Sequence, residues 1–296
     1  MNSGITNSTT ELLKKVRRIE LKTKGLSSQI FSGEYHSAFK GRGMAFSEVR
    51  EYMPGDEIRT IDWNVTARLG EPYVKVFQEE RELTTILLID VSASDNFGST
   101  EKLKRNLITE ISAVLAFSAI QNNDKVGVIF FSDRVELYIP PKKGKSHILR
   151  VIREMIQIKP KSKGTHIAEA LTFLNRVQKK RTICFLISDF MDKNDYSSVL
   201  KISNKKHDLV AFKIYDHREY DMPNIGLVRF VDPETGAAQW VDTSSKKARL
   251  HYAQQAQQQQ IQSEQVMRKS GVDFVSIGTH ENFVKPIMNL FKRRGK

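Results

Sequence analysis

Short, strongly apolar segments alternate with amphipathic ones from residue 83 onward, and this alternation restricts the possible folds more than any other feature. Residues 83–89, 126–131 and 182–188 are largely apolar runs rich in branched side chains, as in strands buried on both faces. Between the first two runs, apolar residues recur at helical spacing from about residue 100 to 121. The pattern predicts an α/β fold with a doubly wound, mostly parallel sheet covered by helices on both faces.

The rest of the chain continues the alternation with one insertion. Further predicted strands are Val135–Ile139, Leu209–Tyr215 and Val272–Ile277, and further predicted helices cover about residues 147–158, 167–177, 196–202 and 281–292. Leu227–Val231 and Gln239–Asp242 flank a Pro- and Gly-containing turn and predict a small β-hairpin. A Gln-rich stretch, Ala253–Gln262, lies in a helix-favouring segment. It indicates a long solvated helix, with a disordered interaction tract as the alternative.

The region before residue 83 has a different character. Glu11–Leu21 has the spacing of an amphipathic helix, whereas residues 33–82 mix glycines, turn residues and opposed charges and close with a predicted strand at Tyr73–Phe77. Two regions follow: residues 1–82, an N-terminal helix and irregular segment packed on the main domain, and residues 83–296, the α/β domain with an insertion at about 220–270. We expect the opposed charges of residues 41–68, which include Arg50 and Asp56, to form ion pairs that hold this irregular segment, with Trp63 as its hydrophobic anchor. A partner-facing surface is the alternative.

Composition and charge limit the expected binding partners and cellular compartment of the protein. The formal net charge is +13, but residues 246–296 carry ten basic and three acidic side chains, so much of the surplus lies in the last fifth of the chain. We expect a solvated helix and a frayed basic tail there, rather than a nucleic-acid site. No stretch approaches the roughly 18 apolar residues of a membrane span, and the polar N-terminus does not resemble a signal peptide. With Cys184 as its single cysteine, the chain is expected to be cytoplasmic, without an integral membrane segment.

Polar residues lie in three loops that we expect at one edge of the predicted sheet. Asp90, Ser92 and Ser94 follow the first strand, Thr165 precedes a helix, and Asp189 ends a later strand. In open α/β sheets the loops at the carboxyl ends of the strands meet at one edge and bind ligands there. Five oxygen-bearing side chains at one edge suit a hard divalent cation, Mg²⁺ or Mn²⁺. With few anionic ligands the ion stays electrophilic, and an open position would attract an Asp or Glu carboxylate from a partner protein.

These residues resemble a known site. The Asp-x-Ser-x-Ser motif at Asp90, the later Thr165 and Asp189 at a strand end are similar to the metal-ion-dependent adhesion site, or MIDAS, of von Willebrand factor A domains. Upstream, the segment from Gly41 to Arg68, which includes Pro54-Gly55-Asp56, looks like the hallmark of the DUF58 family. The resemblance covers about residues 33–245.

The resemblance implies a von Willebrand factor A-like, Rossmann-like α/β domain. It also implies a metal-dependent, non-enzymatic protein-interaction module with a MoxR-type AAA+ ATPase as partner, acting in assembly or maturation of other proteins. Asp95 departs from the family pattern, since many relatives have Met there, and it could alter the charge of the metal site.

Two other functions compete with this one. A metal-dependent phosphoesterase would need an added base or a second metal near Asp90, and Asp95 is the only obvious extra carboxylate. A nucleic-acid binder would act through the basic C-terminal region and lose affinity steeply with salt. The interaction module is favoured because no general base or nucleophile accompanies the oxygen cluster.

Overall fold

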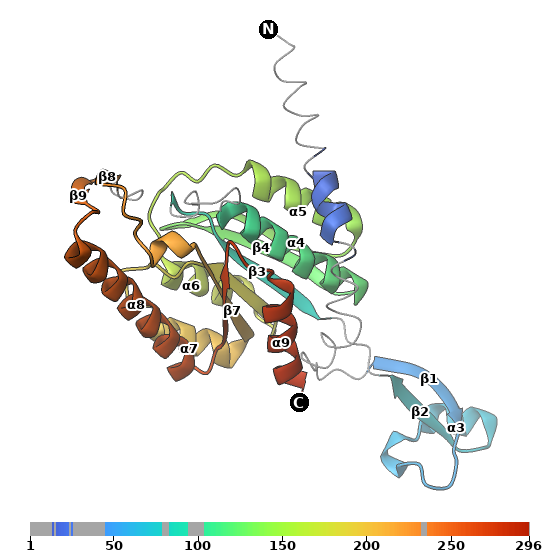
Figure 1. Ribbon diagram of the computed structural model, residues 1–296. Coiled ribbons are helices and arrows are strands. Elements are labelled where there is room, and N and C mark those ends of the chain that lie inside the picture. The colour runs from blue at the N-terminus through green and yellow to red at the C-terminus, as the bar shows by residue number, and fades with distance from the viewer. Residues whose placement is uncertain are drawn as a thin grey trace. The chain divides into compact units, whose positions relative to one another are not determined.

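A computed structural model describes residues 14, 16–23, 25, 45–78, 83–93, 104–231 and 236–295. Residues 40–83 form one compact unit, and residues 1–39 with 84–296 form the other (Figure 1). The chain therefore divides near residue 83. The predicted N-terminal segment, residues 1–82, is shared between the two units.

The larger unit is built on a six-stranded sheet. Its strands lie in the order β10-β7-β6-β3-β4-β5, and every neighbouring pair is parallel except β4 and β5. They span β3 (Thr84–Asp90), β4 (Lys125–Phe131), β5 (Val135–Lys142), β6 (Ile183–Ser188), β7 (Asp208–Tyr215) and β10 (Asp273–Gly278). The doubly wound, mostly parallel sheet predicted from the apolar runs is confirmed.

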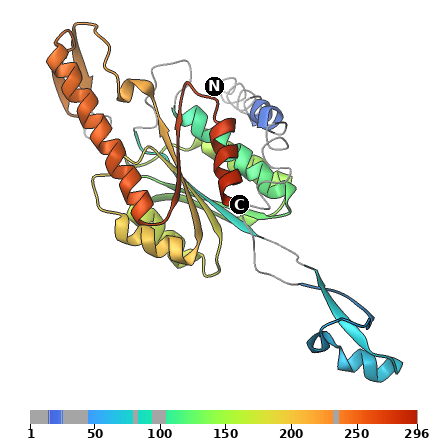
Figure 2. The same cartoon turned by 60° about the horizontal axis from the view of Figure 1, so that its bottom comes forward.

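Helices cover both faces of this sheet (Figure 2). They span α4 (Lys104–Gln121), α5 (Lys145–Gln157), α6 (Ile167–Val177), α7 (Ser197–Lys206), α8 (Lys246–Lys269) and α9 (Val284–Gly295). Successive strand residues point to opposite faces, so Ile86 and Leu88 pack in one core cluster with Leu171 of α6 and Met267 of α8. The opposite face carries α4, α5 and α9, and includes the aromatic pair Phe185 and Phe291, whose ring centroids are 6.4 Å apart.

The antiparallel edge depends on one glycine. A Cβ at Gly127 of β4 would lie 2.8 Å from Ile86 Cδ1 and 3.0 Å from the Ile139 carbonyl oxygen, closer than packed atoms allow. The β4–β5 pairing is irregular at this point, between Val126 and Val128. Absence of a side chain thus lets β5 bend close over β4.

The predicted insertion follows β7. A short 3₁₀ helix, η3 (His217–Glu219), leads to a hairpin of β8 (Leu227–Val231) and β9 (Ala238–Asp242), whose turn at 232–235 lies outside the described residues. The Gln-rich stretch then lies within α8, which is a single helix of 24 residues. A long helix was the expected form of this segment, and it is confirmed.

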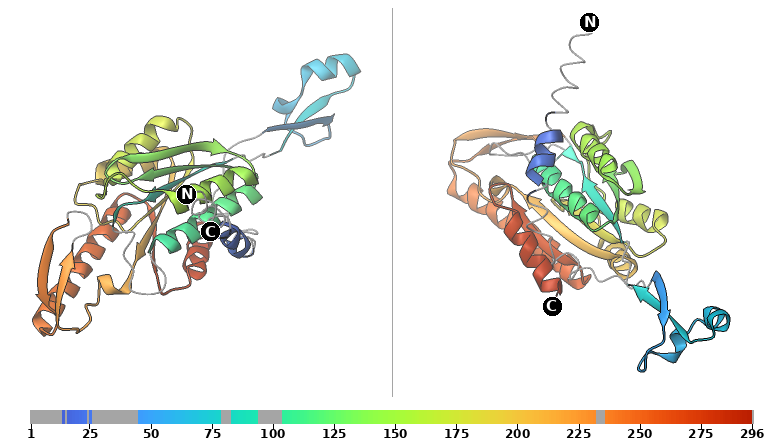
Figure 3. Two further views of the ribbon diagram at one scale, coloured as in Figure 1. Left: turned by 90° about the horizontal axis from the view of Figure 1, so that it is seen from above. Right: turned by 90° about the vertical axis from the view of Figure 1, so that its right-hand side faces the viewer.

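The smaller unit contains regular elements that the sequence pattern left unassigned: β1 (Ala45–Glu51), η1 (Ile58–Thr60) and α3 (Trp63–Leu69), beside the predicted strand β2 (Tyr73–Gln78) (Figure 3). Asp62 caps α3 by accepting hydrogen bonds from the backbone N–H groups of Asn64 and Val65. Arg50 and Asp56 form the expected ion pair, with two hydrogen bonds of 2.8 and 2.6 Å. The expected anchor is wrong, because Trp63 is 67% exposed.

The predicted N-terminal helix is present at residues 14, 16–23 and 25, and the first residues of the predicted range, 11–13, lie outside the described residues. The Glu20 carboxylate pairs with Lys145 of α5 at 2.6 Å, and Lys22 pairs with Glu110 of α4 at 2.7 Å. Among the described helices, none is long and apolar enough to cross a membrane.

Candidate metal centre

Asp90 is the last residue of the central strand β3, and its side chain is fully buried. Its Oδ1 accepts a hydrogen bond of 2.9 Å from the backbone N–H of Ser92, and its Oδ2 accepts one of 2.6 Å from the Ser188 hydroxyl at the end of β6. The neighbouring strand and the following turn therefore fix the carboxyl group in one orientation.

Burial and a neighbouring carboxylate dominate the electrostatic environment of Asp90. Burial is the main cause that raises the pKa of this carboxyl to about 7, and the nearby charge of Asp189 raises it further. Hydrogen bonds from Ser188 and Ser92 oppose the rise without cancelling it. A cation beside Asp90 would favour its ionised form.

The loop after β3 lies beside the loop before α6, because the backbone N–H of Ala93 donates to the Lys163 carbonyl oxygen at 3.0 Å. Ser92 and Thr165, one in each loop, are both buried. Of the five predicted ligands, Asp90, Ser92 and Thr165 therefore come from adjoining loops. Ser94 lies outside the described residues, as does Asp95.

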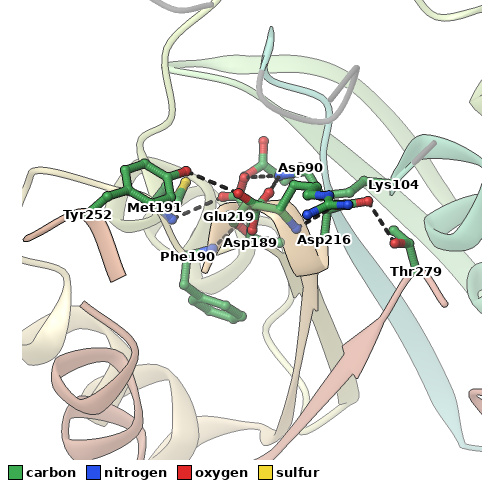
Figure 4. A network of polar contacts seen from close by, with 11 residues as sticks. Asp90, Lys104, Asp189, Phe190, Met191, Asp216, Glu219, Tyr252 and Thr279 are labelled. Carbon is green, nitrogen blue, oxygen red and sulfur yellow. Dashed lines mark hydrogen bonds and ion pairs between the residues drawn. The ribbon is translucent and has the colours of Figure 1, made fainter. Parts of the chain in front are cut away.

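Asp189, the fifth predicted ligand, is held by a lysine that sequence reasoning missed. Its Oδ2 is 2.8 Å from Nζ of Lys104 in α4, and the same Nζ is 2.7 Å from Oε1 of Glu219 in η3. Lys104 and Asp189 are each about 1% exposed. Figure 4 shows these side chains gathered with Asp90 at the edge of the sheet. One buried ammonium thus forms ion pairs with two buried carboxylates.

A signal for Lys104 exists in the sequence. It stands one helical turn before Leu107 and Ile108, so it shares their apolar face. Lys213 gives a similar signal in the sequence, because it interrupts the apolar run of β7. In the structure this residue is only 5% exposed. Buried lysines generally need a carboxylate or another acceptor, and both positions could have been singled out on that ground.

The carboxylate and hydroxyl oxygens near Asp90 are the type of ligand that a hard divalent cation binds. Asp90, Asp189 and Glu219 carry three carboxylates against the two ammonium groups of Lys104 and Lys213, and burial raises the pKa of Glu219 as well. A cavity of about 20 Å³ adjoins Asp90 and Ser92, which is room for one water molecule. No cluster of three or more His, Cys, Asp or Glu side chains placed to hold a metal occurs in the part of the chain that the structure describes. The hydroxyl oxygens of Ser92 and Thr165 would therefore be needed beside Asp90.

The other candidate groups are enclosed. The Cys184 thiol lies within β6, and burial raises its pKa to about 12. Thr182 Oγ1 lies 3.2 Å from that sulfur and 3.1 Å from His207 Nδ1, and both Cys184 and His207 have no exposed surface. These residues therefore fill the core.

The sheet order, its antiparallel edge strand and the helices on both faces define a doubly wound α/β domain. The chain belongs to the family described as "Protein of unknown function DUF58", whose model matches residues 48–262. The resemblance seen in the sequence is thereby confirmed at the level of family and fold.

Several individual proteins are similar to this chain. The uncharacterized protein Mb1516 of Mycobacterium bovis is 28% identical over 290 residues, which cover 96% of this chain and 91% of that protein. Among solved structures, the conserved hypothetical protein BatB from Bacteroides thetaiotaomicron is similar with a TM-score of 0.49 and 16% identity, covering 72% of this chain and 98% of that one. The SpRpn10 VWA domain is similar with a TM-score of 0.36 and 12% identity, covering 72% and 95%.

Proposed function

We propose that the protein binds a divalent cation, Mg²⁺ or Mn²⁺, through Asp90, Ser92 and Thr165 and presents it to a carboxylate of a partner protein. The carboxyl group of Asp90 supports the proposal most directly. It is fully buried at the carboxyl edge of the sheet, fixed by two hydrogen bonds, and its pKa is raised to about 7. The bound ion would supply a Lewis-acidic position for an Asp or Glu of the partner.

The donor set favours recognition over catalysis. Ser92 and Thr165 are neutral donors, and Asp189 is engaged by Lys104. The cysteine thiol and the His207 imidazole, which could serve as nucleophile and base, are enclosed in the core. The chain therefore serves as an interaction module in this proposal, and not as an enzyme.

A MoxR-type AAA+ ATPase is the partner in this proposal. The choice rests on the resemblance of the Gly41–Arg68 segment and the Asp-x-Ser-x-Ser motif to DUF58 proteins. Such a pair would act in the assembly or maturation of other proteins, with the ATPase contributing an acidic side chain to the ion.

Calorimetric titration with Mg²⁺ and Mn²⁺ tests the metal site. We expect the wild-type chain to bind one ion and Asp90→Asn to bind it at least about tenfold more weakly, because the substitution removes the buried ligand charge. Asp195→Asn is the matched control, since this carboxylate caps α7 through the Ser197 backbone N–H at 2.9 Å. Equal affinity in the wild type and Asp90→Asn would contradict the proposal.

The partner claim is tested separately with a purified MoxR-type ATPase. Surface plasmon resonance should show a complex in Mg²⁺ that dissociates in EDTA and that Asp90→Asn does not form. A complex that persists unchanged in EDTA would remove the metal from recognition, whatever the titration shows.

A further inference from the structure

A cavity of about 650 Å³ adjoins the candidate metal centre and belongs to none of the functions considered above. It lies between the loop that follows β6, the η3 helix and the inserted helix α8. Asp189, Met191 and Glu219, which are labelled in Figure 4, are part of its lining. Its volume is in the range of small-molecule binding sites.

Lys213 is a buried positive charge in the lining of this cavity. Its ammonium is 3.4 Å from the Ser263 hydroxyl of α8 and 6.0 Å from the centre of the Tyr220 ring, and both partners are neutral. Among the described residues no carboxylate lies within ion-pair distance of it. Asp189, Glu219 and Glu264 are the nearby acids. Lys104 bridges the first two, and Glu264 accepts a hydrogen bond of 3.0 Å from the Gln260 side chain.

Burial lowers the pKa of Lys213, although the charges of Asp189 and Glu219 oppose this shift. A buried ammonium whose direct contacts are neutral is costly, since water has been removed and no carboxylate of the described residues has taken its place in contact with the charge. The cavity beside it gives an anion the space to make that contact.

The wall formed by α8 adds uncharged donors. Gln259 and Gln262 line the cavity with amide groups that can donate hydrogen bonds. Ala256 and Val266, also in the lining, supply apolar surface. The combination suits a ligand with one anionic end and a short apolar stem.

Two acidic residues in the cavity lining, Asp192 and Asp195, limit the charge of that ligand. Asp192 accepts a hydrogen bond of 2.7 Å from the Ile167 backbone N–H at the start of α6, and Asp195 caps α7. Both carboxyl groups belong to the lining of the cavity. A monoanion matched to the single charge of Lys213 is therefore favoured over a phosphate dianion, which would bring surplus negative charge beside these carboxylates.

We propose that this cavity is a carboxylate-binding site in which the Lys213 ammonium pairs with the carboxylate of a small organic acid or of a glutamate side chain. The site needs no metal, so it stands independently of the function proposed above.

Saturation-transfer difference NMR with butyrate as the probe, in EDTA and at constant ionic strength, tests the site. We expect butyrate to bind the wild-type chain and butyramide to bind at least about tenfold more weakly, because a charge-assisted contact is lost. N-Acetylglutamic acid α-amide and N-acetylglutamine α-amide form the second pair, and the side-chain carboxylate of the first is the only charge by which they differ. Preference for the acid in this pair identifies a protein side chain as a competent source, and preference confined to butyrate identifies a small organic acid.

Three variants decide the outcome. Lys213→Met should reduce butyrate affinity at least about tenfold, while Lys193→Met, an exposed lysine in the same lining, should leave it unchanged. Ala256→Trp keeps Lys213 but fills the cavity from α8, and it should also abolish binding. Equal binding of butyrate and butyramide, or full affinity in both Lys213→Met and Ala256→Trp, would overturn the proposal.

Discussion

At the scale of single residues, the Lys104 ammonium is the positive charge closest to Asp189 and Glu219, at 2.8 and 2.7 Å. A divalent cation at Asp90 would sit near the same carboxylates. Lys104 therefore stabilises the metal-free site, and its positive charge repels a metal ion that approaches the same carboxylates. The two cations compete for the same negative charge.

Lys104→Met should make the protein less stable and more responsive to metal. Removing one partner of a buried ion pair costs about 3–5 kcal/mol, because the carboxylates remain uncompensated. Addition of Mg²⁺ should then stabilise the variant more than the wild type. Urea unfolding with and without Mg²⁺ measures both effects.

Lys22→Met is the control for this substitution, since the Lys22–Glu110 pair is largely exposed at the lysine and should contribute at most about 1 kcal/mol. If Mg²⁺ stabilised Lys104→Met no more than the wild type, the two cations would not share a site.

Sequence reasoning found part of this site for a clear physical reason. Asp90 and Ser92 stand directly after an apolar run, and the carboxyl end of such a strand is where a polar cluster meets other loops. The Lys104–Glu219 contact joins residues 115 positions apart, and pairing at that separation depends on how α4 and η3 pack. The buried charges could be noticed in the sequence, but their partners could not be chosen.

At the scale of elements, the central strands β3, β4 and β6 were predictable because their apolar runs are nearly continuous. The boundaries of α6 and β8 agree with those expected. The elements β1 and α3 were missed. β1 carries Glu48, Arg50 and Glu51 and has no apolar run, and α3 is a helix of seven residues. Its Asp62 cap and Gly70, which ends it with a φ of 79°, were the readable signals.

His207 joins two elements, since it caps the C-terminus of α7 and contacts Thr182 just before β6. Burial lowers the pKa of this imidazole to about 4, and the charges of Lys206 and Arg181 add to the effect. In the unfolded chain the pKa is near 6.5. As pH falls below about 6.5, the unfolded state takes up a proton that the native state resists, so stability is lost.

We expect His207 to lower the free energy of unfolding by about 2 kcal/mol as the pH falls from 7 to 4.5. Urea unfolding of the wild type and of His207→Gln at both pH values isolates the effect as the difference in pH dependence, because other titrating groups are common to both proteins. Parallel pH profiles in the two proteins would show that His207 titrates normally in the fold.

At the scale of the whole molecule, the surplus of positive charge near the C-terminus is partly used inside the fold. The expected frayed basic tail is wrong for the described residues of this segment, because α9 continues to Gly295 and Phe291 is fully buried. Arg294 hydrogen-bonds to Asp208 at the start of β7 and to Asp273 at the start of β10. This guanidinium thus connects the last helix to two adjacent strands.

Arg294→Met should therefore destabilise the larger unit, whereas Arg293→Met, at an exposed neighbouring position, should change stability by no more than about 0.5 kcal/mol. The Arg294 side chain is 13% exposed and that of Asp208 22%, so the loss of its charge-assisted bonds should cost about 1–3 kcal/mol. Chemical unfolding followed by circular dichroism gives both values. Equal stability of the two variants would mean that the end of α9 is held by Phe291 and its apolar neighbours alone, and that the basic residues remain available to solvent.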